Sequence, residues 1–303
     1  MSLIEEKQIE VIRMQSNPSP SEISPWEIPS ISEELLEIKN ICEKENPDWL
    51  IVDHYGLSIE WETTINKLGI PLLVIDDLFR QHHCEALLDQ NFNPQSAERY
   101  SSLVPNNAKL FLGPEYALLS KSFQATSPQH RDFNKIESIL LSFGGSDPDG
   151  ETVKALTALQ KHFQDIRLIV VVGRANPFIP QIQKIAEGQL NTELHIQTSQ
   201  MAELMNRADL YLGAGGSTTW ERCYLGLPGI CVATAENQFE ISSELANQGV
   251  HLFLGYSKDL DGSEYIQAIS NLKKNHDQLK KYSENSLALG VGSKTKEILE
   301  LFK

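Results

Sequence analysis

The chain has 303 residues, a formal net charge of −15, 41% hydrophobic residues and 22% charged residues. This length accommodates two α/β domains of roughly 120 to 170 residues each, with enough apolar side chains for full cores. The acidic balance argues against a nucleic-acid or anionic-membrane surface but leaves an anionic small ligand open, because backbone N–H groups bind phosphate without formal charge.

The first part of the chain predicts an irregular start followed by a helix. Residues 1–14 resemble the end of a helix and a short strand from Ile9 to Met14, and residues 16–29 form a proline- and serine-rich loop. A helix is predicted from about Ser32 to Glu45, with Ser32 as its N-cap. A doubly wound domain normally opens with a strand and a glycine-rich turn, and neither is present here.

Strands and helices then alternate up to residue 89. The predicted elements are a strand at 48–53, a helix at 59–68 and strands at 70–76 and 86–89. This alternation predicts βαβ units and a parallel sheet. The segments 110–117 and 124–135 are interpreted as the crossing to a second domain.

The second half repeats the alternation more regularly. The predicted strands are 136–143, 166–172, 192–196, 209–213 and 229–233. The predicted helices are 152–163, 179–187, 201–208 and 219–225, two more after Phe239 and Gly262, and a last one at 294–302. We therefore predict an α/β fold of two Rossmann-like domains, residues 1–122 and 123–303.

Ligands of open α/β sheets bind beyond the carboxyl ends of the strands, and conspicuous loops occupy that position here. These loops are His54–Gly56, Gly144–Asp147, Gly173–Asn176, Gly213–Glu221 and Glu236–Gln238. Each loop alone is weak evidence, but five of them at strand ends predict a ligand site.

The loop Gly213–Glu221 carries the most chemical information. Its glycines let the backbone approach a ligand closely, and the first N–H groups of the following helix point at that ligand. Ser217 and Thr218 add hydroxyl donors, and Glu221, about one turn into the helix, can hold a pair of sugar hydroxyls. Phosphate at the turn and a diol at the carboxylate describe a nucleotide. The alternative is a tight turn whose glycines serve packing alone.

Two other loops of the second half allow two readings each. Gly144–Ser146 can bring backbone amides to a phosphate or to a reacting sugar, or it can be a turn in which Asp147 or Asp149 caps the next helix. Asn237 and Gln238 are either turn and cap residues or ligand contacts.

Polar residues of the first half are open in the same way. Tyr55 either lines a ligand or lies at a boundary with its hydroxyl in water. The two histidines at 82–83 are expected in a solvated loop, and Arg80 is expected to pair with Asp76 or Asp77.

Six segments together resemble the UDP-sugar hydrolases of pseudaminic acid biosynthesis. They are Val52–Gly56, Ile75–Asp77, Leu88–Asn91, Leu141–Asp147, Gly213–Glu221 and Glu236–Gln238. Those enzymes hydrolyse UDP-2,4-diacetamido-2,4,6-trideoxy-β-L-altropyranose to UDP and the free sugar, a step toward flagellin glycosylation. The family is similar to the lipid-II glycosyltransferase of peptidoglycan synthesis and shares its GT-B architecture of two Rossmann-like domains. The resemblance covers nearly the whole chain.

The resemblance implies inverting hydrolysis without a metal or cofactor. Water attacks the anomeric carbon, and UDP leaves into a site of helix-start amides that stabilise its growing negative charge. By matching, Tyr55 and Asn237 would line the sugar and the water and are the catalytic candidates. The substrate-binding candidates are Gly215, Gly216, Ser217 and Thr218 for the diphosphate, Glu221 for the ribose, Met201 for the uracil, and Gly144, Gly145, Ser146, Asn176, Asn237 and Gln238 around them.

One family motif has no counterpart in this sequence. The family begins with a strand and a Gly-x-Gly-His-x-x-Arg loop whose histidine resembles the general base or acid, whereas Leu3–Lys7 here matches a later helix. We therefore expect an incomplete sugar-side domain over 1–122 and a UDP-binding domain over 123–303. Loss of a general base typically costs about a hundred- to ten-thousandfold in rate, so weak or absent activity is expected.

Two other functions stay open. A glycosyltransferase of the same architecture would pass the sugar to an acceptor, and a basic or apolar membrane-docking patch would favour it; this acidic chain offers no clear one. A non-catalytic UDP-sugar-binding protein would lack turnover. Four cysteines without CxxC spacing predict reduced thiols and no metal site, and the absence of a signal peptide or long apolar run predicts a cytoplasmic protein, which we expect to be a monomer.

Overall fold

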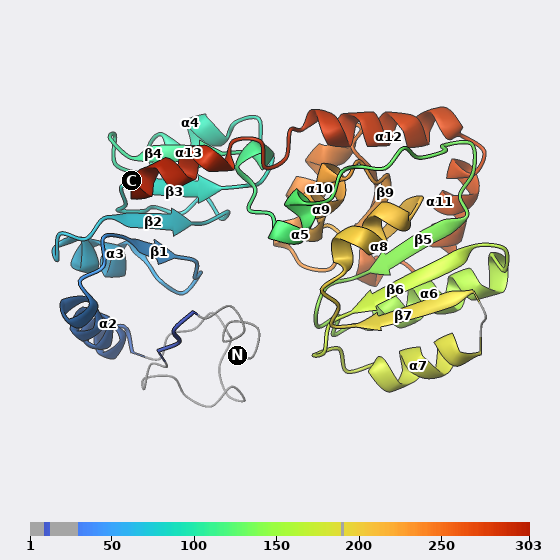
Figure 1. Cartoon of the computed structure of the whole chain (residues 1–303), viewed down its shortest axis with the longest axis horizontal. Helices are drawn as coiled ribbons and strands as arrows, with labels where there is room; N and C mark the ends of the chain where they lie inside the picture. Colours follow the sequence, from blue (N-terminus) through green and yellow to red (C-terminus); the bar gives the residue numbers. More distant parts are fainter. Residues whose placement is uncertain (1–8, 13–29, 189–190) are drawn as a thin grey trace. The chain divides into compact units, whose positions relative to one another are not determined.

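A computed structural model describes residues 9–12, 30–188 and 191–303. It contains two compact units (Figure 1). The N-terminal unit runs to Asp89 and includes residues 94–112 and 298–303, and the C-terminal unit comprises residues 90–93 and 113–297. Among the described residues, no helix is long and apolar enough to cross a membrane.

The N-terminal unit is built on a parallel sheet whose strands follow one another in chain order. In its described residues the sheet has four strands in the order β1-β2-β3-β4. The strands are β1 (Leu50–Val52), β2 (Leu72–Ile75), β3 (Ala86–Asp89) and β4 (Lys109–Leu112). The helices are α2 (Ile31–Glu45), α3 (Ile59–Asn66) and α4 (Ser96–Tyr100). Val52, Trp61, Ile65, Val74 and Leu87 belong to its core.

Helix α2 begins slightly earlier than the sequence predicts. Ser30, not Ser32, is the N-cap: it has extended backbone geometry, and its hydroxyl accepts a hydrogen bond from the amide of Glu33. Asn46 ends the helix in the left-handed conformation. The strand predicted from Ile9 to Met14 is wrong for residues 9–12, which have no regular structure, and its last two residues lie outside the described part. The helix end and the proline-rich loop predicted before residue 30 also lie outside it.

The C-terminal unit contains a larger sheet that is parallel throughout. In the described residues it has six strands in the order β10-β9-β8-β5-β6-β7. The strands are β5 (Ser138–Ser142), β6 (Arg167–Val172), β7 (Thr192–Ile196), β8 (Leu210–Ala214), β9 (Gly229–Ala233) and β10 (Leu252–Tyr256). The chain therefore moves outward from β5 to β7 and then returns to the other side of β5 with β8.

Helices cover both faces of this sheet. The helices of this unit are α5 (Lys121–Gln124), α6 (Glu151–His162), α7 (Ile179–Glu187), α8 (Met201–Arg207), α9 (Thr218–Tyr224), α10 (Asn237–Asn247), α11 (Ser263–Leu272) and α12 (His276–Ala288). Short 3-10 turns lie at Pro114–Tyr116 and Ser257–Asp259; the last elements, α13 (Thr295–Leu299) and the 3-10 turn Glu300–Phe302, lead into the N-terminal unit. Ile139 and Leu141 pack in one core cluster with α6 and α11, whereas Leu140 between them packs in another with α8. This two-sided burial is typical of a doubly wound fold.

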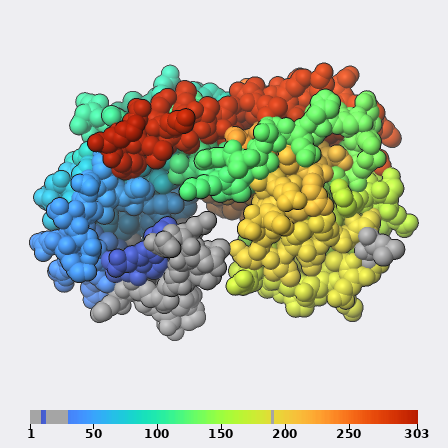
Figure 2. Space-filling model, in the orientation of Figure 1, coloured from blue at the N-terminus to red at the C-terminus, as the bar shows by residue number. Residues whose placement is uncertain are grey.

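The end of this unit is tied back to its beginning. The amides of Gly292 and Lys294 donate to the carbonyl oxygens of Pro114 and Glu115. Figure 2 shows the two segments side by side at the surface, the red C-terminal segment against the green one. The residues predicted as a simple crossing between domains thus contain strand β4 and this docking segment.

Candidate functional site

The C-terminal unit has its topological switch point between β5 and β8. The two strands pair in parallel with Ser142 opposite Gly213, so the loops that follow them start at the same level of the sheet. In open α/β sheets this is where a crevice for ligands forms. The switch point therefore brings together two of the loops that the sequence singles out, Gly144–Asp147 and Gly213–Thr218.

Some glycines of these loops are required by close packing. A Cβ on Gly213 would overlap the carbonyl oxygen of Ser142, and one on Gly215 would overlap the hydroxyl of Ser242 in α10. A Cβ on Gly173 would likewise meet the backbone of Gly145, so the loops after β5 and β6 are in contact. Close packing therefore requires glycine at these three positions.

Other glycines of the loops face open space. The nearest atom to a Cβ on Gly216 would be Nε2 of Gln238, at 3.5 Å, and a Cβ on Gly145 would meet nothing within 4 Å. Ser217 and Ser146 are exposed, and Thr218 begins α9 half-buried. The structure thus leaves the backbone of Gly145 and Gly216 accessible, as contact with a ligand would need.

The Asp147 carboxylate caps helix α6. Its two oxygens accept hydrogen bonds from the amides of Glu151 and Thr152, each at 2.9 Å, which confirms the capping interpretation for this residue. Asn176 supports the same loop: its amide nitrogen lies 3.4 Å from Asp147 Oδ2, and its oxygen accepts from the amide of Phe178 at 2.8 Å. Asn176 is buried, so its side chain fixes the loops after β5 and β6.

The loop after β9 contributes the next candidates. Helix α10 begins at Asn237, earlier than the sequence predicts, and Asn237 is exposed in its first turn. Gln238 Oε1 accepts from the amide and the hydroxyl of Thr234, at 3.0 and 3.1 Å, which directs Nε2 toward Gly216. Gln238 therefore belongs beside the switch point. Met201 begins α8 after β7, two strands away from β5.

Glu221 lies about one turn into α9, where the sequence predicts a ribose contact. Its side chain is half-buried, and burial raises its pKa from 4.5 to about 7. A carboxylate held in a desolvated position costs stability and is typical of functional sites.

A buried network that the sequence does not reveal lies under the same loop. Arg222 is fully buried; Nη1 donates to the carbonyl oxygen of Leu227, and Nη2 lies 3.0 Å from His251 Nδ1. Burial and the nearby guanidinium lower the pKa of His251 to about 3, so the ring is neutral and accepts at Nδ1. Its Nε2 then donates to the carbonyl oxygen of Ser242, the residue against Gly215. This series of hydrogen bonds links α9 to α10 beneath the glycine turn.

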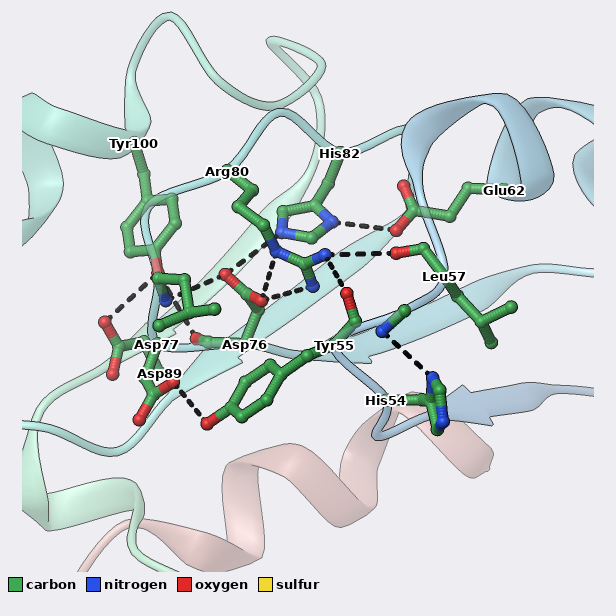
Figure 3. Close-up of polar contacts among 12 residues, drawn as sticks. His54, Tyr55, Leu57, Glu62, Asp76, Asp77, Arg80, His82, Asp89 and Tyr100 are labelled. Carbon is green, nitrogen blue, oxygen red and sulfur yellow. Dashed lines mark hydrogen bonds and ion pairs between the residues drawn. The ribbon is translucent and has the colours of Figure 1, made fainter. Parts of the chain in front are cut away.

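The N-terminal unit holds a separate polar cluster at the carboxyl ends of β1 and β2 (Figure 3). The Tyr55 hydroxyl donates to Asp77 Oδ1 at 2.6 Å, so it is not simply in water. Burial, and then the Asp77 carboxylate, raise the pKa of Tyr55 far above its ordinary value. The phenol therefore stays protonated at any physiological pH.

Behind this pair lies a chain of charged groups. Arg80 pairs with Asp76, as predicted. The solvated position predicted for the histidines is wrong for His82, which is 3% exposed. Its Nδ1 lies 2.8 Å from Glu62 Oε1, and its Nε2 lies 3.3 Å from Asp76 Oδ2 without the alignment of a hydrogen bond. Burial alone would lower the pKa of His82, but the two carboxylates raise it to about 9.

The C-terminal unit matches a known protein family. The family model of the glycosyltransferase family 28 C-terminal domain matches residues 139–301, more than half of the chain. The chain belongs to this glycosyltransferase 28 family. The matched residues contain the sheet of the C-terminal unit from β5 onward, and with it all the loops around the switch point.

Two relatives are similar to this chain over more than half of its length. A UDP-2,4-diacetamido-2,4,6-trideoxy-β-L-altropyranose hydrolase of Campylobacter jejuni is 27% identical over 227 residues, 74% of this chain and 80% of that protein. The spore coat polysaccharide biosynthesis protein SpsG of Bacillus subtilis is 29% identical over 171 residues, 56% of this chain and 50% of that protein. The resemblance to the UDP-sugar hydrolases is thereby confirmed.

A solved structure confirms the fold. The crystal structure of Acinetobacter baumannii MurG matches with a TM-score of 0.65 at 14% identity, covering 99% of this chain and 86% of that chain. The α/β fold with two Rossmann-like domains of the GT-B class is therefore correct.

The raised pKa of Glu221 in this family 28 domain predicts a pH-dependent stability. The folded protein favours the neutral carboxyl, so stability falls as the pH rises from about 4.5 through about 7. Glu221→Gln should leave the free energy of unfolding nearly unchanged at pH 4, below the unfolded pKa, and raise it by about 1–3 kcal/mol at pH 8. Urea unfolding at both pH values measures this, with exposed Glu203→Gln in α8 as the control. An equal effect at both pH values would contradict the prediction.

Proposed function

We propose that the chain is a cytoplasmic UDP-sugar hydrolase of pseudaminic acid biosynthesis. It would cleave UDP-2,4-diacetamido-2,4,6-trideoxy-β-L-altropyranose to UDP and the free sugar, as a monomer that needs no nucleic-acid or membrane partner. The C. jejuni hydrolase, similar over most of both chains, is the observation that carries this proposal. The open glycine loops at the switch point of the family 28 domain support it.

In this proposal the C-terminal unit binds UDP. The accessible backbone of Gly144, Gly145 and Gly216 and the hydroxyls of Ser146, Ser217 and Thr218 bind the diphosphate, and the buried Gly215 lets the turn pack against α10. The Glu221 carboxylate accepts hydrogen bonds from the two ribose hydroxyls. These bonds favour the ionised carboxylate and so offset the desolvation that raises its pKa. Met201 packs by the uracil, and Asn176 holds the loops after β5 and β6 in place. Preorganised donors at the diphosphate would stabilise the charge that grows on UDP as it leaves.

In this proposal Tyr55 of the N-terminal unit and Asn237 and Gln238 of the C-terminal unit contact the sugar and the attacking water. The phenol stays protonated and donates its hydrogen to Asp77, so Tyr55 would accept a hydrogen bond from the water or from a sugar hydroxyl and would not act as the base. Asn237, exposed in the first turn of α10, offers both a donor and an acceptor.

The decisive experiment follows the sugar product in water enriched with ¹⁸O. Hydrolysis at the anomeric carbon places the label in the free sugar and leaves UDP unlabelled. A high protein concentration is used so that slow turnover is detected. Product that forms only when a lipid or sugar acceptor is added would favour a glycosyltransferase. Calorimetric binding of UDP with no product over long incubation would favour a non-catalytic UDP-sugar-binding protein.

The glycine turn itself predicts a selective loss of nucleotide binding. Gly216→Ala places a methyl group at ordinary contact distance from the end of the Gln238 side chain and in a backbone conformation that alanine can adopt, so the melting temperature should change little. The methyl group would keep the diphosphate from the backbone, and the affinity for UDP should fall at least about tenfold, or 1.4 kcal/mol. Calorimetric titration with UDP measures this. Gly188→Ala, at the exposed end of α7, is the matched control and should bind UDP normally.

A further inference from the structure

We propose that Arg80 is a positioning residue for the reaction: it clamps the loops that follow β1 and β2 and so holds the Tyr55 hydroxyl against Asp77. The inference rests on the proposed function, in which Tyr55 lines the sugar and the attacking water. It adds a role for a side chain that need not touch the substrate itself.

The clamp is made by the planar guanidinium of Arg80. On one side, Nη1 donates to the carbonyl oxygens of Tyr55 at 2.6 Å and of Leu57 at 3.2 Å. On the other side, Nε and Nη2 both donate to Asp76 Oδ1, at 2.9 and 2.5 Å. A guanidinium has donors on several edges in a fixed plane and can hold both loops at once, whereas a lysine ammonium acts as a single point.

The Asp76 end of the clamp is itself fixed. Asp76 Oδ2 accepts from the amide of Leu78 at 3.0 Å, and the hydroxyl of Tyr100 donates to the Asp76 carbonyl oxygen at 3.2 Å. The same Tyr100 hydroxyl reaches Asp89 Oδ2 at 3.1 Å, which ties in the end of β3. Three neighbouring strand ends are therefore held together around the backbone and side chain of Asp76 (Figure 3).

Charge balance makes this arrangement tolerable in a buried place. Glu62 accepts from the amide of His83 through Oε2 and contacts His82 through Oε1, and His82 lies between Glu62 and Asp76. With His82 protonated and Arg80 charged, the row Glu62, His82, Asp76, Arg80 alternates in sign and has no net charge. Burial would raise the pKa of Asp76, but the nearby His82 ring and the hydrogen bonds from Arg80 and from the amide of Leu78 lower it, so Asp76 stays ionised.

The clamp determines the geometry of the hydrogen-bonded pair Tyr55 and Asp77. Tyr55 is held through its own carbonyl oxygen, and Asp77 follows directly after the clamped Asp76, so the two side chains meet at 2.6 Å between Tyr55 Oη and Asp77 Oδ1. Because the phenol keeps its proton, Tyr55 is the donor and Asp77 the acceptor of this hydrogen bond. Without Arg80 the two loops would no longer be held at this separation.

The position of Arg80 favours preorganisation over core stability. Its side chain is 29% exposed and joins two strand-end loops through oxygen atoms alone, at the margin of the core cluster to which Leu57 and Tyr100 belong. Ion pairs of this kind are weak evidence for stability, and rigid support of a site is a common use for them.

The test measures the position of Tyr55 directly and the reaction separately. The protein is labelled with 3-fluorotyrosine, and the Tyr55 resonance is assigned by its loss in Tyr55→Phe. In Arg80→Ala this resonance should move toward that of an unstructured tyrosine, and in Arg80→Lys it should move part of the way.

For turnover of the UDP-sugar, Arg80→Ala should lower kcat by about 10- to 100-fold with little change in KM. Added guanidinium, which can enter the vacated and partly exposed position, should restore part of kcat and the resonance. Lys67→Met, an exposed cation after α3, is the control and should change neither.

Each outcome decides the proposal. An unchanged Tyr55 resonance in Arg80→Ala overturns it, and so does a shifted resonance with unchanged kcat. A global loss of the fold would shift every fluorotyrosine resonance; Arg80→Lys, which keeps the charge, then decides between unfolding and loss of the clamp. Absence of any hydrolysis by the unaltered chain would refute the proposed function, whereas the resonance would still show whether Arg80 positions Tyr55. Affinity for UDP should be the same in all these variants.

Discussion

Gly213→Ala is expected to destabilise the C-terminal unit by at least about 3 kcal/mol, because a side chain at this position has no space to occupy. Gly213 lies in β8 directly opposite Ser142 of β5. A methyl group there would overlap the Ser142 carbonyl oxygen and the ring of Tyr211, whose hydroxyl donates to that same oxygen. Relief of the overlap would require β5 and β8 to separate at the centre of the sheet.

Urea unfolding followed by the fluorescence of Trp220, which is buried in this unit, measures the loss. Gly216→Ala is the matched control: the same substitution three residues further on meets only the end of the Gln238 side chain and should cost less than about 1 kcal/mol. Equal effects of the two substitutions would show that β5 and β8 are not packed as described. The pair also separates the two uses of glycine in one short turn, packing at Gly213 and access for a ligand at Gly216.

The sequence predicts the C-terminal sheet well because its strands are strongly patterned. Buried parallel strands such as β6 and β9 are short, almost wholly apolar runs, each followed by a polar or glycine-containing loop, and this pattern is typical of a buried parallel strand. Strand β10 escapes prediction because it is an edge strand whose residues are all half-buried, with a glycine inside it. Strand β4 escapes prediction because Gly113 and Pro114 follow it and make the segment resemble a connection.

The candidate site is predictable only as far as its loops carry their own signal. The glycine turn before α9 and the carboxylate of Glu221 can be recognised locally, from spacing alone. The supporting network cannot, because Arg222, His251 and Ser242 come together only through packing of distant elements. The same holds for His82: two adjacent histidines suggest a polar loop, and only its Glu62 partner on α3 accounts for its burial.

His82→Gln is expected to destabilise the N-terminal unit by about 3–5 kcal/mol near pH 6, because it leaves two buried carboxylates without their shared cation. The pKa of His82 is raised from 6.5 to about 9 in the folded protein, since the carboxylates of Asp76 and Glu62 outweigh burial. A group with a raised pKa contributes its full stabilisation below its unfolded pKa and loses it as the pH rises through the folded one. The other charged group that faces this site is Arg80, which stays charged throughout. The difference between the two proteins should therefore be largest below about pH 6.5 and shrink steadily toward pH 9.

Each protein is equilibrated in urea at a series of pH values and is then given a hydrogen-exchange pulse at one fixed pH. The intrinsic exchange rates of the amides, which depend on pH, are therefore the same in every sample. Protection of the α3 and β2 amides then reports the N-terminal unit alone. His83→Gln is the matched control, since this neighbouring residue contacts Glu62 through its backbone amide, which the substitution keeps. A destabilisation that is constant or grows between pH 6.5 and 9 would mean that His82 is neutral in the folded protein. The charge alternation behind Tyr55 would then fail, and Asp76 would depend on Arg80 alone for its counter-charge.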